Sequence, residues 1–299
     1  MGRRPQFTRT LRSPAGRVIL LAVVAVAGAL FLRAPGLDVR DGRDDRGKNG
    51  IALGSSWIAG DAALPALAVG EIARSIREHH IAELYVQLPP PNADGALTGI
   101  DSARIEALLY ECYNARGWAQ IGIAQLPFDD PRWRRLFAVE IRRLLDRLPR
   151  LRGIQLDLSN IPDISPALLT LLDELRPALA PDARPLSIIA RLWEEPYFRE
   201  VAHRADQLVI PLEVASSPFS RFSTRQNIRR IGSTLAWSGK KPVLFRIPAD
   251  KRLRRALSTI HFAFSKTSAS AQYQGIILET GSLPDDALWS ELRTRFLRP

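Results

Sequence analysis

The sequence has little cysteine and little histidine, and each shortage excludes a class of chemistry. Its single cysteine, Cys112, cannot form a disulfide within the chain or build a thiolate metal cluster. Cys112 lies on an apolar helical face, where we expect a small buried side chain rather than a nucleophile. The histidines all fall in predicted helices and lack the spacing of metal ligands, so we expect no metal site and no catalytic triad. They are His79, His80, His203 and His261.

Several short motifs are also missing. The sequence has no Gly-x-Ser-x-Gly motif, no phosphate-binding Walker motif and no Gly-rich dinucleotide fingerprint. These absences argue against a serine hydrolase of that type, a nucleotide hydrolase and a dinucleotide-dependent dehydrogenase. We therefore expect no cofactor.

Positive charge is concentrated at the start of the chain. The formal net charge is +11, and residues 1–50, with ten Arg or Lys and four Asp or Glu, supply +6 of it. This charge lies beside an apolar run, so it indicates membrane topology rather than a nucleic-acid partner.

The first 33 residues have the pattern of a membrane anchor or a signal segment. Residues 1–17 hold five arginines and no acidic residue, and the apolar run from Val18 to Leu32 follows. A basic flank of this kind stays in the cytoplasm, so the rest of the chain would face outward. As a helix the run would span about 22 Å, less than the roughly 30 Å of a hydrocarbon core. Both readings stay open for residues 18–33, although the small-residue cleavage patterns fall inside the run, which favours the uncleaved anchor.

The sequence divides into four predicted segments. Residues 1–17 form a basic cytoplasmic tail and residues 18–33 the transmembrane anchor or signal. Residues 34–53 are rich in Gly, Asp and Arg, which is typical of a flexible linker, and residues 54–299 form the folded domain. We expect a single-pass protein of the cell inner membrane, with its folded domain in the periplasm or outside the cell.

After the linker, short apolar runs alternate with amphipathic ones. Apolar spacings of three and four, as in Leu168, Leu171 and Leu175, predict helices, and Asp101 and Asp130 are typical helix starts. Eight strand–helix units of about thirty residues predict an α/β fold, a (β/α)8 or TIM barrel; a doubly wound open sheet is the alternative, but its Gly-rich turn is missing. Strands are expected near 56–59, 82–88, 119–126, 152–158, 186–192, 207–213, 242–247 and 274–279. Helices are expected near 66–79, 101–116, 131–148, 165–179, 196–204, 223–237, 251–264 and 285–296.

The fourth predicted strand alternates polar and aliphatic residues. Side chains of a barrel strand point alternately into the lumen and toward the helices. Gln155, Asp157 and Ser159 therefore face the lumen, and the aliphatic residues between them meet the helices. Burying polar side chains in a barrel lumen costs free energy unless they are hydrogen-bonded, ion-paired or part of a functional site.

Polar and aromatic residues follow most of the predicted strands. Because barrel sites form at the carboxyl ends of the strands, we expect these side chains to gather around one opening. A flat pyranose face stacks on an aromatic ring such as Trp193, while amides, arginines and carboxylates bind sugar hydroxyls. The predicted substrate-binding residues are Tyr85, Gln87, Gln125, Gln155, Ser159, Arg191, Trp193 and Arg246. Asp61 after the first strand and Glu194 and Glu195 after the fifth are further strand-end residues.

Carboxylates at the strand ends allow two interpretations. Glycosidic hydrolysis normally needs two carboxyl groups, and the catalytic candidates are Asp157 with either Glu213 or Glu279. Alternatively, the carboxylates are structural, and Asp157–Arg246 and Glu279–Arg191 are ion pairs that close the top of the barrel.

Adjacent arginines occur at three places in predicted helices, at 142–143, 229–230 and 254–255. Such pairs are most often solvated helix faces. Contact with anionic lipid or an acidic polymer is the alternative.

Several segments are similar to a known family. They are Ile81–Val86 with Pro91–Gly95, Leu151–Asp157, and Tyr197–Glu200 followed by Asp206–Ile210. Over residues 54–298 the chain resembles bacterial exported glycoside-hydrolase-like TIM-barrel proteins, which are distantly related to family 18 chitinases. The resemblance implies a barrel whose partner is a carbohydrate polymer.

The departures from that family fall on its catalytic residues. The family's fourth strand ends in a Glu general acid, and Ser159 occupies the matched position here. A serine hydroxyl cannot donate a proton at a useful pKa. The family's sixth strand ends Met-x-Tyr-Asp, whereas Leu212 and Glu213 stand at the last two positions here. Asp157 keeps the family's residue type.

Three functions stay open on these grounds. The first is a barrel that binds or helps to process a cell-envelope or extracellular polysaccharide without family-18-type hydrolysis. The second is an active glycosidase with a relocated carboxylate pair. The third is a structural partner in an envelope protein complex.

Overall fold

Strands and helices alternate along the part of the chain that the structure describes. This computed structural model describes residues 18, 21–26, 42, 44–54, 66–214, 221–266, 271–280 and 283–298. The strands are β1 Gly50–Leu53, β2 Glu83–Gln87, β3 Arg116–Gly122, β4 Leu151–Asp157, β5 Leu186–Ile189, β6 Gln207–Pro211, β7 Val243–Pro248 and β8 Tyr273–Thr280. The helices are α3 Ala66–Glu78, α4 Ser102–Glu111, α5 Pro131–Arg147, α6 Pro166–Leu179, the 3-10 helix η2 Ala180–Asp182, α7 Glu195–Arg204, α8 Arg221–Trp237, α9 Leu253–Lys266 and α10 Asp286–Arg295.

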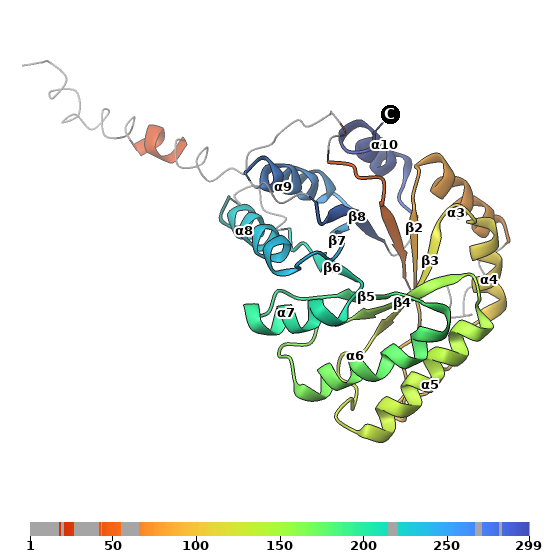
Figure 1. Cartoon of the computed structure of the whole chain (residues 1–299). Helices are drawn as coiled ribbons and strands as arrows, with labels where there is room; N and C mark the ends of the chain where they lie inside the picture. The colour runs from red at the N-terminus through yellow and green to blue at the C-terminus, as the bar shows by residue number, and fades with distance from the viewer. Residues whose placement is uncertain are drawn as a thin grey trace, which may run out of the picture.

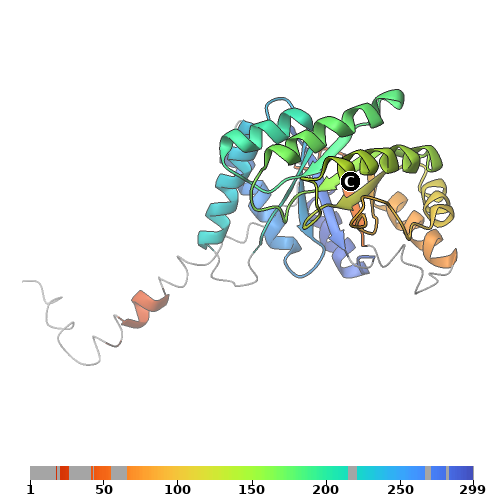
Figure 2. The ribbon, with the colours of Figure 1, turned by 90° about the horizontal axis from the view of Figure 1, so that it is seen from below.

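The eight strands form a closed parallel barrel. Each strand pairs with its neighbours in sequence, and β8 pairs with β1 to complete the ring. Figure 1 shows the helices outside the strands, and Figure 2 shows the same arrangement turned by 90°. The predicted (β/α)8 barrel is confirmed. Two predicted helix starts are also confirmed, because Asp101 and Asp130 accept hydrogen bonds from the first turns of α4 and α5.

The first strand lies earlier than the sequence suggested. β1 occupies Gly50–Leu53, inside the range predicted as linker, and all four of its residues are buried. Its backbone pairs with both β2 and β8, so tertiary pairing fixes a strand that is too short to show a hydrophobic pattern. The strand predicted at 56–59 and the candidate residue Asp61 lie outside the described residues.

The residues just before β1 are tied to the amino-terminal ends of several strands. The Asn49 carbonyl accepts from the Glu83 amide at 3.1 Å, and its Oδ1 accepts from the Ile276 amide at 3.2 Å. Asn49 Nδ2 donates to Asp45 Oδ1 at 2.8 Å, and Asp45 Oδ2 accepts from the Arg298 amide at 3.0 Å. The chain therefore enters the barrel at the amino-terminal ends of the strands. We call this end the base and the opposite end the mouth.

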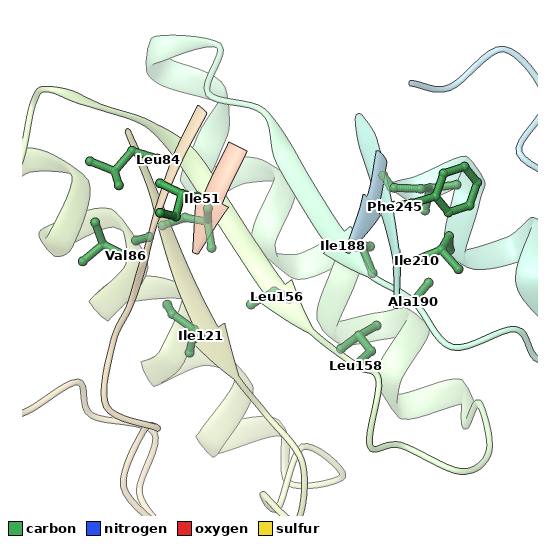
Figure 3. Close-up of a cluster of buried hydrophobic side chains, with 14 of the residues drawn as sticks. Ile51, Leu84, Val86, Ile121, Leu156, Leu158, Ile188, Ala190, Ile210 and Phe245 are labelled. Carbon is green, nitrogen blue, oxygen red and sulfur yellow. The ribbon is translucent and has the colours of Figure 1, made fainter. Parts of the chain in front are cut away.

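The main hydrophobic core lies between the strands and the helices. Ile154, Leu156 and Leu158 of the fourth strand and its end are buried in it, as the alternation predicted. Figure 3 shows Leu156 and Leu158 with aliphatic side chains of the neighbouring strands. These residues use the helix-facing positions of the strands, which leaves the alternate positions for the lumen.

A smaller apolar cluster fills the lumen. Tyr85 and Trp118 stack in it, with ring centroids 5.9 Å apart. The cluster consists of Ala52, Tyr85, Trp118, Ile189, Val209, Leu244 and Ile277. The lumen is therefore a packed core and not a channel.

A buried carboxyl group lies at the base of the lumen. The Glu83 side chain is 2% exposed, accepts a short hydrogen bond from Trp118 Nε1, and lies 3.7 Å from Arg116 Nη1 and 3.5 Å from Arg152 Nη1. Burial raises the pKa of Glu83, and the Trp118 hydrogen bond and the two arginines oppose that rise.

The predicted anchor falls largely outside the described residues. Of residues 18–33, the structure describes residue 18 and residues 21–26, which are helical. Within the described part of the chain, no helix has both the length and the apolar character needed to cross a bilayer.

Candidate functional site

Three charged side chains form one network across the mouth. Arg246 of β7 donates from Nη1 to Asp157 Oδ2 at 2.9 Å and from Nη2 to Glu279 Oε1. Asp157 ends β4, which is not adjacent to β7, so this ion pair crosses the opening of the barrel. The predicted Asp157–Arg246 pair is confirmed.

The second predicted ion pair is wrong. Glu279 binds Arg246 rather than Arg191. β7 is adjacent to β8, whereas Arg191 follows β5 on the other side of the ring. Sequence position places a residue at the end of a strand, but the distance around the barrel decides which charges meet.

Arg246 is held as a cation. Its side chain is 14% exposed. Burial is the largest single influence and lowers its pKa, but the hydrogen bonds and charges of Glu279 and Asp157 together raise the pKa above its usual value. The network therefore keeps a guanidinium fixed between two carboxylates.

Both oxygens of Asp157 are engaged. Oδ2 accepts from Arg246, and Oδ1 accepts from the Ser159 amide at 2.9 Å and from Ser159 Oγ at 2.5 Å. Ser159 is thus bound to Asp157, and its hydroxyl proton points at that carboxylate. Asp157 acts here as an acceptor that holds the β4–α6 loop and the β7 arginine together.

Two of the predicted binding residues lie too deep to reach a ligand at the rim. Tyr85 and Gln155 are buried in the lumen below the mouth. Gln155 Nε2 donates to Ser187 Oγ at 3.0 Å, and Gln207 Nε2 donates to Tyr85 OH at 2.8 Å and to Ser187 Oγ at 3.4 Å. The predicted lumen orientation of Gln155 is confirmed. Its polar group is satisfied within the barrel, which explains how a polar side chain is tolerated there.

The two remaining glutamines lie at different places. Gln87 is exposed and ends β2, as expected. Gln125 is exposed but lies beyond β3, which ends at Gly122, so its predicted place on the third strand is wrong. Gln125 has φ 63°, a left-handed conformation that a strand residue does not adopt. The apolar run continues past the strand, and for that reason the pattern placed the strand end too late.

Trp193 is not an exposed stacking surface. It is 8% exposed, packs in the main core, and donates from Nε1 to the Ile161 carbonyl at 3.1 Å. This bond joins the β5–α7 loop to the β4–α6 loop. The predicted stacking role of Trp193 is therefore corrected to a structural one.

An exposed tyrosine follows the β5–α7 loop at the start of α7. Tyr197, in the first turn of α7, is 48% exposed. Together with Arg191, Trp193, Asp163 and Glu194 it lines a hollow of about 460 Å³. Tyr197 thus presents the aromatic face that the sequence assigned to Trp193.

A second hollow adjoins the first. It has a volume of about 190 Å³ and is lined by Ser159, Asn160, Arg191, Glu213 and Arg230 among others. Arg191 lines both hollows and is exposed. The two hollows share Arg191 and Leu192 in their lining, and we call them together the rim groove. Ser159, which is bonded to Asp157, connects the groove to the Asp157–Arg246–Glu279 network.

Glu213 faces solvent at the edge of this groove. Its side chain is 80% exposed, and Oε2 lies 3.4 Å from Arg230 Nη1. The backbone carbonyl of Glu213 accepts from Asn227 Nδ2 at 2.9 Å. Of the catalytic candidates, the structure joins Asp157 and Glu279 through Arg246 and places Glu213 in the groove.

Several residues of the groove were not identified from the sequence, among them Tyr197, Arg230 and Asn160. Tyr197 and Arg230 were assigned to helices, and Asn160 follows the fourth strand without belonging to it. Helical periodicity alone does not show that the first turn of α7 borders the mouth. A signal was available for Tyr197, because helix starts in a (β/α)8 barrel all lie at the mouth.

The described residues include no group of three His, Cys, Asp or Glu side chains that could hold a metal ion. The polar groups that line the groove are arginine, carboxylate, hydroxyl and amide groups.

Comparison with solved structures identifies barrels of the same kind. The spore cortex-lytic enzyme SleL from Bacillus cereus superposes with a TM-score of 0.58 at 12% identity, over 88% of this chain and 76% of that chain. GH5_18 from Bifidobacterium longum gives 0.57 at 12% identity, over 84% and 76%. A chitinase from Chromobacterium violaceum gives 0.55 at 13% identity, over 84% and 99%.

The chain shares the (β/α)8 barrel fold with these three proteins. At identities this low the likeness establishes the fold and leaves the residues of the mouth to be interpreted on their own. No protein-family model and no curated protein sequence matches the chain.

Proposed function

We propose that the rim groove binds a carbohydrate polymer and that the barrel does not hydrolyse it by the family 18 route. The observation that carries the proposal is the exposed ring of Tyr197 beside Arg191 in the hollows at the mouth. An aromatic face accepts the apolar face of a pyranose, and charged and amide groups around it bind hydroxyls. The glycoside-hydrolase neighbours are consistent with such a ligand.

The arrangement around Asp157 supports binding without hydrolysis. Ser159 stands where the resemblance expects the general acid, and its hydroxyl is bonded to Asp157. Asp157 and Glu279 share the Arg246 guanidinium, so both are held as acceptors of the same cation. A hydrolase needs one carboxyl that donates a proton to the leaving group, and both oxygens of Asp157 already accept hydrogen bonds within the protein.

We further propose that the barrel works outside the cytoplasm, anchored by residues 18–33. The support is the basic, acid-free flank of residues 1–17 followed by the apolar run. Proteinase K added to intact spheroplasts should digest the barrel. Protection of the barrel until the membrane is permeabilised would contradict this placement.

The binding proposal is tested by calorimetry with the purified full-length protein in detergent against a panel of soluble polysaccharide fragments. For the fragment that binds, Tyr197→Ala should weaken affinity about tenfold, which is about 1–2 kcal/mol, because the stacking surface is lost. Tyr110→Ala is the matched control, since Tyr110 is 61% exposed on α4, away from the mouth.

A reducing-end assay on the same fragments should show no hydrolysis above the rate without protein. If Tyr197→Ala binds the fragment as tightly as the wild type does, the rim groove is not the binding site. If the protein releases reducing ends and this release stops in Asp157→Asn, the protein is an active glycosidase and the proposal of binding without hydrolysis is wrong.

A further inference from the structure

The two ends of the barrel differ in charge. Beyond the aspartates that cap helices, the exposed acidic residues at the mouth include Asp94, Asp129, Asp163, Glu194, Glu195, Glu213, Glu279 and Asp286. They outnumber the exposed cations there, which include Arg132, Arg191, Lys251 and Arg254. At the base, cations predominate in the loops and at the strand starts. These basal cations are Arg116, Arg150, Arg152, Arg184, Lys240 and Lys241.

Three carboxylates pair with four of these six cations. Arg150 Nε lies 2.8 Å from Glu106 Oε1, and Arg184 Nε lies 3.6 Å from Asp182 Oδ2. Arg116 and Arg152 share the single carboxylate of Glu83, at 3.7 and 3.5 Å. Lys241 Nζ donates to the neutral carbonyl of Ala205 at 2.6 Å, and Lys240 is exposed. The base therefore keeps an excess of positive charge at its surface.

Three of the basal cations line a hollow at the base, and exposed tyrosines lie at the same end of the barrel. Arg150, Arg152 and Arg184 line a depression of about 570 Å³ together with Asp182. Tyr110 at the end of α4 is 61% exposed, and Tyr113 in the following base loop is 75% exposed. Tyrosine is enriched at the headgroup level of membranes, and clustered Arg and Lys bind anionic headgroups.

The path of the chain keeps the base near the proposed anchor. Residues 45 and 49 are bonded to the base, as described above, and ten residues, 34–43, separate that part from segment 18–33. Ten residues reach at most about 35 Å. The base is thus the end of the barrel within shortest reach of the membrane surface.

We infer that the base rests on the membrane, where its cations bind the headgroups of anionic phospholipids, and that the mouth points away from the bilayer. This inference rests on the proposed anchoring by residues 18–33. The helix-face pairs at 142–143 are a poorer fit for lipid, because Arg142 is bound by Asp146 and Asp182, and Arg143 by Glu140.

The test uses the full-length protein with one fluorescent label. Cys112, which is buried, is replaced by Ala, and a single cysteine is introduced by Asn114→Cys at the base or Thr98→Cys in the β2–α4 loop at the mouth. Each labelled protein is reconstituted into phosphatidylcholine vesicles with or without 30% phosphatidylglycerol, containing a headgroup-attached quencher lipid.

The label at position 114 should be quenched about threefold more with phosphatidylglycerol than without it, and 500 mM salt should abolish the difference. The label at position 98 should show no such dependence. The double variant Lys240→Gln/Lys241→Gln should at least halve the lipid-dependent quenching, whereas Arg142→Gln/Arg143→Gln should leave it unchanged.

The outcomes separate this inference from the anchoring proposal. Failure of the protein to float with either kind of vesicle would overturn the anchoring and the orientation together. Flotation with equal quenching at position 114 in both kinds of vesicle would leave the anchoring in place and overturn the binding of anionic headgroups. Stronger quenching at position 98 than at position 114 would reverse the orientation.

Discussion

Arg246 is the side chain on which the polar structure of the mouth depends. It supplies the positive charge between Asp157 and Glu279, and Asp157 in turn holds Ser159. Removing the guanidinium would leave the 15%-exposed Asp157 carboxylate without its ionic partner. An unpaired, partly buried charge costs more than the loss of an exposed ion pair.

Arg246→Met should therefore lower the free energy of unfolding by about 3 kcal/mol at pH 7, measured by urea denaturation. Adding Asp157→Asn to this variant should recover part of the loss, because the uncompensated charge is removed. Arg199→Met is the control, since its pair with Glu195 is exposed and should contribute less than about 1 kcal/mol. Equal losses in the two single variants would contradict the account.

Glu83 predicts a pH dependence of stability at the base. Burial raises its pKa in the folded protein above the ordinary value of 4.5, so the folded state holds the proton more tightly than the unfolded state. The stabilising contribution of the protonated group is fully present below about pH 4.5 and is lost as pH rises through the folded pKa.

The difference in unfolding free energy, wild type minus Glu83→Gln, should thus fall as the pH is raised above 4.5 and then level off. Urea denaturation of both proteins between pH 4 and pH 8 measures this difference, and other titrating groups cancel in it. A difference that grows with pH would mean that Arg116 and Arg152 outweigh burial.

Single residues were the hardest to place from the sequence. Alternation in the fourth strand predicted that Gln155 faces the lumen, because that depends only on backbone geometry. It did not show that Trp193 is covered by the β4–α6 loop while Tyr197 is exposed, since exposure depends on loops packed against each other. Which arginine meets Glu279 was likewise set by position around the barrel.

The packing of β4 depends on a glycine. A Cβ atom at Gly153 would lie 2.2 Å from the Pro185 carbonyl oxygen and 3.1 Å from Trp118 Cζ3. One of these neighbours is backbone of the chain entering β5, and the other is an aromatic ring of the lumen core. The start of β4 can therefore approach both only without a side chain.

Gly153→Ala should destabilise the protein by about 1–3 kcal/mol through overpacking, measured by thermal or urea unfolding. Gly122→Ala, at the end of the neighbouring β3, is the matched control, because a Cβ atom there meets nothing within 4 Å. That variant should change stability little or raise it slightly. Similar losses in both variants would attribute the effect to the strand rather than to the close approach.

Long elements with strong periodicity were predicted well, and short or weakly patterned ones were not. Helices such as α5 and α6 begin within one residue of the prediction, because capping residues and apolar spacing agree. β1 was missed because four residues of strand follow a Gly- and Asp-rich segment and depend on pairing with β2 and β8. The propensity of the segment is overridden by its tertiary context.

At the scale of the whole molecule, the count and order of the elements sufficed to predict a closed barrel. Eight strand–helix units in unbroken alternation have few alternative arrangements. The contrast between an acidic mouth and a basic base was not visible in the sequence, because the residues of each end are spread along the chain and only the fold gathers them.

The bond between Asn49 and the Ile276 amide joins residues 227 positions apart. If the barrel is exported amino terminus first, β1 can pair with β8 and close the barrel only after nearly the whole polypeptide has crossed the membrane. During that interval β1 has an unpaired edge, and premature partners for it are a hazard of biogenesis. A chain interrupted before its last strand would therefore be a target for proteolysis rather than a smaller working barrel.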